Sequence, residues 1–138
     1  MIGDPIPGPG RFCWVDLAAT DAVRAKAFYR DLLAWDARDT IANGGIFTRL
    51  VREGRDVGSL YQLDPRMGEA ASSSHWTAYV RVDDVDATAR RAVALGGQTL
   101  VRPFVVEGIA RIALVLDAVG AVLGLWQPID RHRADTRG

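Results

Sequence analysis

Two strand-like segments, FCWVDLAA and HWTAYVRV, carry the side chains with the clearest chemical potential. Because side chains alternate between the two faces of a strand, Asp16 would share a face with Trp14. An apolar wall raises the pKa of a carboxyl group towards neutrality, and such a carboxylate can act as a general base. Asp16 or His75 is therefore the candidate base, with Tyr79 or an arginine as the acid or oxyanion partner.

The same alternation predicts the complete lining of a pocket. Its predicted members come from the first and last strands of two units: Trp14, Asp16, His75, Thr77, Tyr79, Arg81, Gly58, Leu60, Gln62, Val122, Gly124 and Trp126. Aromatic side chains would stack on a planar small molecule, while polar groups such as Arg49 would fix its orientation. The alternative is that Trp14 and Trp126 are core residues, since large aromatic side chains are usually mostly buried.

An internal repeat predicts the elements that position these residues. Each strand-like segment ends at an aspartate that would cap an amphipathic helix, and these residues, Asp21 and Asp84, are 63 positions apart. Three strand-like runs follow each helix: 36–40, 46–52 and 57–63, then 99–105, 109–116 and 121–127. The closing runs GRDVGSL and GAVLGLW align Gly58 with Gly124, at an offset of 66.

The repeat predicts an α+β fold in which two βαβββ modules form a curved mixed sheet around a cavity. We interpret residues 1–138 as one domain: module 1 at about 11–64, a linker at about 65–74, module 2 at about 75–128 and a tail at 129–138. Two sets of residues are predicted to pack beneath the helices. They are Cys13, Val15, Leu17, Val23, Ala27, Phe28 and Leu32 in the first module, and Trp76, Ala78, Val80, Val82, Val85, Ala89, Ala92 and Leu95 in the second.

Composition excludes several classes of protein. The 138 residues carry 17 basic and 17 acidic side chains that are spread along the chain, which argues against nucleic-acid binding. One cysteine, Cys13, allows neither an internal disulfide nor a cysteine-cluster zinc site. No apolar run is long enough to span a bilayer, and the first ten residues do not resemble a signal peptide, so we expect a cytoplasmic protein without membrane contact. The bias towards arginine, alanine and glycine favours a bacterial source.

The segments AFYRDLLAW, YVRVDDVDATARRAVALGG and LVLDAVGAVLGLWQP resemble the vicinal oxygen chelate superfamily, which includes glyoxalase I, bleomycin-resistance proteins and extradiol dioxygenases. The resemblance places the metal-ligand positions of that superfamily on Trp14, Gly58, Thr77 and Gly124. None of these residues is an ordinary ligand of a divalent metal. We therefore expect no metal and no other cofactor, and the resemblance implies a homodimer.

Two functions follow as hypotheses. The leading one is a metal-independent protein that binds an aromatic or antibiotic-like small molecule, with stacking on Trp14 and Trp126 and orientation by Asp16, Arg49, Tyr79 and Arg81. The alternative is a metal-free isomerase, cyclase or lyase that acts on an aromatic or polyketide-like metabolite. A third hypothesis, a partner-binding module, would require a collapsed pocket.

Overall fold

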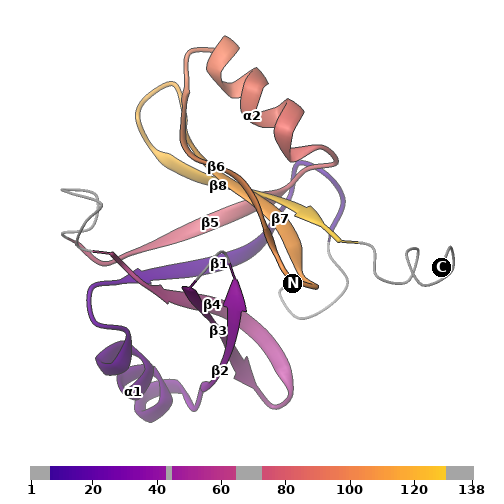
Figure 1. Cartoon of the computed structure of the whole chain (residues 1–138). Coiled ribbons are helices and arrows are strands. Elements are labelled where there is room, and N and C mark those ends of the chain that lie inside the picture. The colour runs from indigo at the N-terminus through magenta and orange to yellow at the C-terminus, as the bar shows by residue number, and fades with distance from the viewer. Residues whose placement is uncertain (1–6, 43–44, 65–72, 130–138) are drawn as a thin grey trace, which may run out of the picture. The chain divides into compact units, whose positions relative to one another are not determined.

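A computed structural model describes residues 7–42, 45–64 and 73–129 (Figure 1). In this part of the chain the elements are β1 (Phe12–Ala19), α1 (Ala22–Leu33), β2 (Asp36–Ala42), β3 (Gly45–Arg52), β4 (Arg55–Gln62), β5 (His75–Arg81), α2 (Val85–Ala94), β6 (Gln98–Val106), β7 (Ala110–Leu116) and β8 (Val122–Pro128). The order strand, helix and three strands occurs twice, so the predicted repeat is confirmed. None of the helices in the described residues is long and apolar enough to cross a membrane.

The chain divides into two compact units. Within the described residues, unit 1 comprises 13–42, 45–64 and 73–78, and unit 2 comprises 7–12 and 79–129. The division therefore lies inside β5. Most of the predicted linker and the tail beyond Ile129 lie outside the described residues, and the interpretation of 1–138 as one domain stays a prediction.

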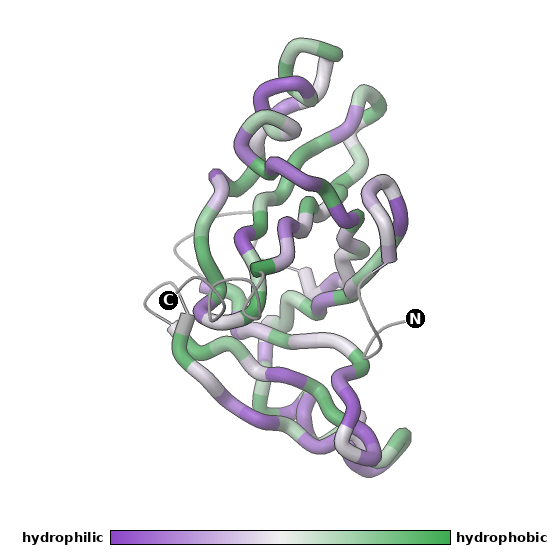
Figure 2. The backbone as a smooth tube through the Cα atoms, turned by 90° about the vertical axis from the view of Figure 1, so that its right-hand side faces the viewer, coloured by the Kyte–Doolittle hydropathy of each residue, from purple (hydrophilic) through white to green (hydrophobic). Residues whose placement is uncertain are grey.

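Each unit contains a mixed sheet. In unit 1 the strand order is β2-β3-β4-β1, with β1 parallel to β4 and the other pairs antiparallel. In unit 2 the order is β5-β8-β7-β6, with β5 parallel to β8. Hydrophilic and hydrophobic stretches alternate along the backbone (Figure 2). The predicted α+β class is confirmed, whereas the predicted cavity stays a prediction.

Both helices begin at the predicted aspartates. Asp21 accepts a hydrogen bond from the backbone N–H of Arg24, and Asp84 accepts one from Ala87, both at 3.0 Å. A glutamine at the end of each closing strand provides a second anchor. The Oε1 atom of Gln62 accepts the Ala22 N–H at 2.8 Å, and Gln127 does the same for Val85 at 2.9 Å. Gln62 therefore binds the start of α1, which differs from its predicted place on the pocket face.

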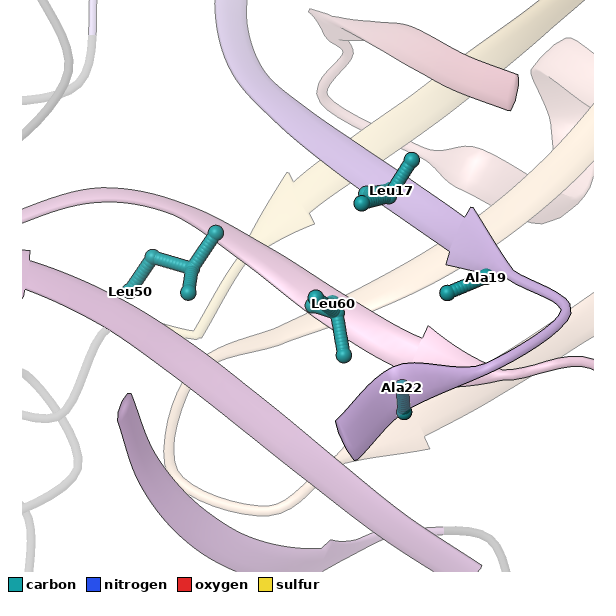
Figure 3. Packing of buried hydrophobic residues seen from close by; sticks show 5 residues of the cluster. All are labelled: Leu17, Ala19, Ala22, Leu50 and Leu60. Atoms are coloured by element: carbon teal, nitrogen blue, oxygen red, sulfur yellow. The ribbon is translucent and has the colours of Figure 1, made fainter. Parts of the chain in front are cut away.

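The core of unit 1 lies between its sheet and α1. Its buried members, shown in Figure 3, are Leu17, Ala19, Ala22, Leu50 and Leu60. Leu17 confirms the predicted face of β1, Cys13 is buried, and Val15 is only partly buried. Leu60 was predicted on the pocket face, but it is fully buried on the helix side.

The buried face of α1 differs from the predicted one. Val23, Phe28 and Leu32 are 76%, 57% and 60% exposed, whereas Ala25 and Tyr29 pack against the core. Small residues allow the helix to approach the sheet closely, and aromatic packing fixes its rotation. The rings of Tyr29 and Trp35 stack at 5.2 Å, and the Nε1–H of Trp76 donates to the Tyr29 hydroxyl at 3.3 Å. Trp76 therefore packs beside α1 and remains 41% exposed.

In unit 2 the predicted buried face of α2 agrees better with the structure than that of α1 does. Val85 and Ala89 are buried against Ala113, Val115 and Leu125, and Val82 and Ala92 pack against this cluster. Val80 is partly buried, as is Ala78, the last residue of unit 1. Leu95 is 63% exposed because it follows the last residue of α2 as its C-cap.

The register of the closing strands corrects the predicted alignment. Asp16 is opposite Ser59, and Tyr79 is opposite Gly124, so Ser59 is the counterpart of Gly124. On β3, Leu50 pairs with Gly58 of β4, and the next residue, Val51, pairs with Asp56. Val57 has no partner between these two pairs and forms a β-bulge. One extra residue exchanges the faces of a strand. Gly58 therefore belongs with the helix side, and the predicted Gly58–Gly124 equivalence is wrong by one position.

Candidate active site

A buried polar network occupies the face of unit 1 opposite α1. Because Asp16 and Ser59 are paired on parallel strands, their side chains lie on the same face. The Ser59 hydroxyl donates to Oδ1 of Asp16 at 2.6 Å, and the Nε1–H of Trp14 donates to Ser59 Oγ at 2.7 Å. The exposed fractions of Trp14, Ser59 and Asp16 are only 5%, 0% and 4%. The predicted association of Trp14 with Asp16 is thus mediated by Ser59.

The environment changes the acidity of two groups in this network. Burial raises the pKa of Asp16 to about 6, although the Ser59 hydrogen bond and the charge of His75 oppose this effect. Burial, together with the negative charge of Asp16, raises the pKa of the Tyr61 hydroxyl to about 12. A carboxyl group with a pKa near 6 is largely ionised at neutral pH and is still basic enough to accept a proton from a weak acid.

Arginines continue the same row across the sheet of unit 1. Arg49 on β3 is opposite Ser59, and Arg38 on β2 is opposite Arg49. Directly opposed residues share one face of a sheet. Arg49 forms an ion pair with Asp56, whose Oδ1 lies 3.2 Å from Arg49 Nη1, and both side chains are about one-third exposed. The predicted orienting role of Arg49 is compatible with its place in this row.

The predicted residues of β5 have different environments. His75 is exposed, and its Nδ1 atom lies 3.0 Å from the Ser73 carbonyl oxygen. Thr77 is buried in unit 1. Arg81 belongs to unit 2, where its Nη1 donates to the Pro7 carbonyl at 3.1 Å and its Nη2 lies 3.8 Å from an oxygen of Asp83.

The equivalent face of unit 2 is aromatic. Tyr79 and Trp126 are each 3% exposed, and their rings meet edge to face at 5.9 Å. The Tyr79 ring covers Gly124 so closely that a Cβ atom there would lie 2.3 Å from it. Val122 is 38% exposed. The burial of Trp14 and Trp126 matches the alternative in which both are packing residues.

The four positions that correspond to superfamily metal ligands do not fit a divalent metal. With the corrected register they are Trp14, Ser59, Thr77 and Gly124, which offer an indole, two hydroxyls and no side chain. The Ser59 hydroxyl is already engaged by Asp16 and Trp14. The described residues contain no group of three or more His, Cys, Asp or Glu that could hold a metal ion.

Two residues of the network, Ser59 and Tyr61, are absent from the sequence-based prediction. The bulge at Val57 is the reason. If the alternation of β4 is counted from the turn at Gly54, the residues after Val57 are assigned to the wrong face of the strand. The signal that reveals them is the glutamine pair. Aligning Gln62 with Gln127 gives an offset of 65 and brings Ser59 opposite Asp16.

The βαβββ repeat and the mixed sheets match the fold that the resemblance to the vicinal oxygen chelate superfamily implies. The family model of the glyoxalase-like domain matches residues 14–122 of the sequence, and the chain belongs to this family. Among solved structures, methylmalonyl-CoA epimerase from Mycobacterium tuberculosis is similar with a TM-score of 0.65 and 22% identity, over 91% of this chain and 93% of that chain. At this identity the likeness shows the fold alone.

Two groups of relatives are similar in sequence. Proteins named "Putative glyoxylase CFP32" from Mycobacterium bovis and Mycobacterium tuberculosis are 35% identical over 121 residues, which covers 86% of this chain and 46% of theirs. The anthracycline biosynthesis protein DnrV from Streptomyces peucetius is 29% identical over 141 residues, which covers 94% of this chain and 51% of that protein. The chain thus spans about half the length of the curated relatives it matches.

Proposed function

We propose that this protein catalyses metal-independent proton transfer on a small organic molecule, with Asp16 as the general base. The observation that carries the proposal is the buried carboxyl of Asp16, whose pKa is raised to about 6. Strongly perturbed carboxyl groups concentrate at functional sites because catalysis needs a pKa near the working pH. The sequence alone favours a binding protein, and the environment of Asp16 is the support for putting the enzyme hypothesis first.

The proposed substrate is an aromatic or polyketide-like carbon acid. A relative named for anthracycline biosynthesis supports this chemical class. Loss of a proton next to a carbonyl group leaves an enolate, which Arg49 in the same row would stabilise. Isomerisation, cyclisation and elimination can all begin with this step.

The test is carbon-bound hydrogen exchange in D2O, measured by NMR with a panel of aromatic β-ketoesters. We expect the protein to catalyse deuterium incorporation, with a rate that rises through pH 6 and does not change after treatment with EDTA. Asp16→Asn should lower the rate at least about 100-fold, because general-base catalysis contributes factors of this size. Asp31→Asn, which changes an exposed carboxylate of α1, is the matched control. Equal exchange in the Asp16→Asn variant would contradict the proposal.

Ligand sequestration without chemistry is the second candidate function. The specific observation in its favour is that the Asp16 carboxyl is only 4% exposed, so little of it is open to a reacting atom. In that case Asp16→Asn would leave the affinity for a neutral aromatic ligand nearly unchanged, and no compound in the panel would exchange. Thermal-shift titration with the same compounds measures binding separately from exchange.

A further inference from the structure

Ser59 accepts one hydrogen bond and donates another, and the chemistry of its two partners decides which is which. An indole N–H can only donate, so Ser59 Oγ must accept the hydrogen bond from Trp14 at 2.7 Å. The Ser59 hydrogen is therefore the one shared with Oδ1 of Asp16 at 2.6 Å. All three side chains are buried.

This arrangement makes the two oxygens of Asp16 unequal. A proton placed on Oδ1 would face the Ser59 hydrogen, and the hydroxyl would have to turn its hydrogen away from Asp16. A proton placed on Oδ2 leaves both hydrogen bonds intact, because Oδ1 still accepts from Ser59. The two hydrogen bonds of Ser59 are therefore the same whether the Asp16 carboxyl is ionised or protonated on Oδ2.

We propose that Ser59, oriented by Trp14, is a positioning residue that holds Oδ1 of Asp16 and directs proton transfer to Oδ2. The inference rests on the proposed function of Asp16 and specifies how that site works. In the reaction the substrate C–H bond breaks, its electron pair stays on the substrate, and the proton moves to Oδ2. The same oxygen then returns the proton to the product.

The second unit shows that the fold does not require a serine here. Gly124 takes the place of Ser59, and Tyr79 takes the place of Asp16, on the same pair of parallel strands. Unit 2 nevertheless forms the same closing strand and helix anchor. The βαβββ framework therefore forms without this hydroxyl, which is present in the unit where Asp16 and Trp14 are its partners.

The test is the pH titration of the Asp16 carboxyl carbon, followed by NMR in the full chain. Other groups that influence this titration are His75 on β5 and Tyr61 on β4, with Arg49 on β3 in the same row, so these residues are left unchanged. Ser59→Ala should move the midpoint upward by about 1 to 2 pH units, because a hydrogen bond to the ionised carboxylate is lost. Ser59→Thr, which restores the hydroxyl, should return the midpoint towards that of the unmodified protein.

Two further variants keep the test decisive. Trp14→Phe retains the ring but lets the Ser59 hydroxyl turn, so it should raise the midpoint by a smaller amount, even if Ser59→Ala fails to fold. Ser73→Ala changes an exposed serine and should leave the midpoint in place. An unchanged or lower midpoint in both Ser59→Ala and Trp14→Phe would overturn the inference.

The outcomes separate this inference from the proposed function. If Ser59→Ala shifts the titration but the unmodified protein catalyses no exchange, Ser59 positions Asp16 and the catalytic proposal is wrong. If exchange depends on Asp16 but its titration is insensitive to Ser59 and Trp14, the catalytic proposal stands and the positioning role is wrong. In the exchange assay itself, Ser59→Ala should move the pH profile by the same amount as the NMR midpoint.

Discussion

The two units place different chemistry on the same framework. Around the parallel strand pair, unit 1 has Asp16 and Ser59 where unit 2 has Tyr79 and Gly124. One step along the strands, Tyr61 corresponds to Trp126, and Trp14 to Thr77. Unit 1 thus buries a titratable polar network, whereas unit 2 buries an aromatic pair over a glycine. The framework sets positions, and the side chains at those positions decide whether a unit holds a buried titratable group.

The largest expected difference between the units is the pH dependence of stability. The folded-state pKa of Asp16, about 6, lies above its ordinary value, so its contribution to the free energy of unfolding is greatest below about pH 4 and is lost as the pH rises through 6. The full effect is about 3 kcal/mol, and about half of it falls between pH 5 and pH 7.5.

This effect can be measured by urea unfolding of the unmodified protein and Asp16→Asn at both pH values. The stability advantage of the variant should grow with pH, and it should disappear at low pH. Tyr79→Phe at the equivalent position should leave the pH dependence as it is. Parallel curves for the unmodified protein and Asp16→Asn would show that Asp16 does not titrate near pH 6.

The next largest effect concerns the glycine of unit 2. Gly124→Ala would place a Cβ atom 2.3 Å from the Tyr79 ring, so the ring must move away from its contact with Trp126. We expect a loss of roughly 1–3 kcal/mol in the free energy of unfolding, as for other overpacked cores. Gly8→Ala, which has nothing within 4 Å of its added methyl group, is the control. Equal stability of the two variants would argue against close packing of Tyr79 on β8.

A smaller loss of stability is expected when the glutamine anchor that both units share is removed. Gln62→Ala and Gln127→Ala each remove the acceptor for the first N–H of a helix, and each should lower stability by about 1 kcal/mol. Gln62 also donates to the carbonyls of Thr20 and Leu63, so its replacement should have the larger effect. Thermal melting of both variants beside Gln98→Ala, an exposed glutamine, checks this order.

The smallest effect contrasts the two helices. Val23→Ala on α1 should change stability by less than about 0.5 kcal/mol because the side chain is 76% exposed. Val85→Ala on α2 removes two methyl groups from a fully buried position and should be clearly destabilising. Comparable losses from the two substitutions, measured by chemical denaturation, would mean that the outer face of α1 is covered in solution.

The sequence predicts the elements better than the faces they present. The predicted strands lie within two residues of the observed ones, because strands, caps and turn glycines repeat in the same order. The predicted buried faces of β4 and α1 are wrong, and the two errors have different causes. A bulge at Val57 adds a residue without any sequence signal of its own, and the rotation of α1 depends on Tyr29 packing with Trp35, which hydrophobicity alone does not specify.

The sequence predicts the part of the candidate site that lies on β1, but not the part that lies on β4. Asp16 and Trp14 were placed together correctly because β1 has no irregularity and its alternation can be read directly. Ser59 could not be found from the turn, and Leu60 and Gln62 were assigned in its place because a one-residue shift exchanges the two faces. The predicted roles of His75, Thr77, Arg81 and Val122 stay predictions, as does the homodimer.

The glutamine anchors have a consequence for the order of folding. Each joins the first turn of a helix to the end of the closing strand, across 40 residues in unit 1 and 42 in unit 2. The first N–H of each helix therefore gains its side-chain acceptor only when the closing strand is in place. Long-range contacts of this kind form late and slow the folding of a chain. The first turn of each helix should consequently become fully ordered only once its closing strand has formed.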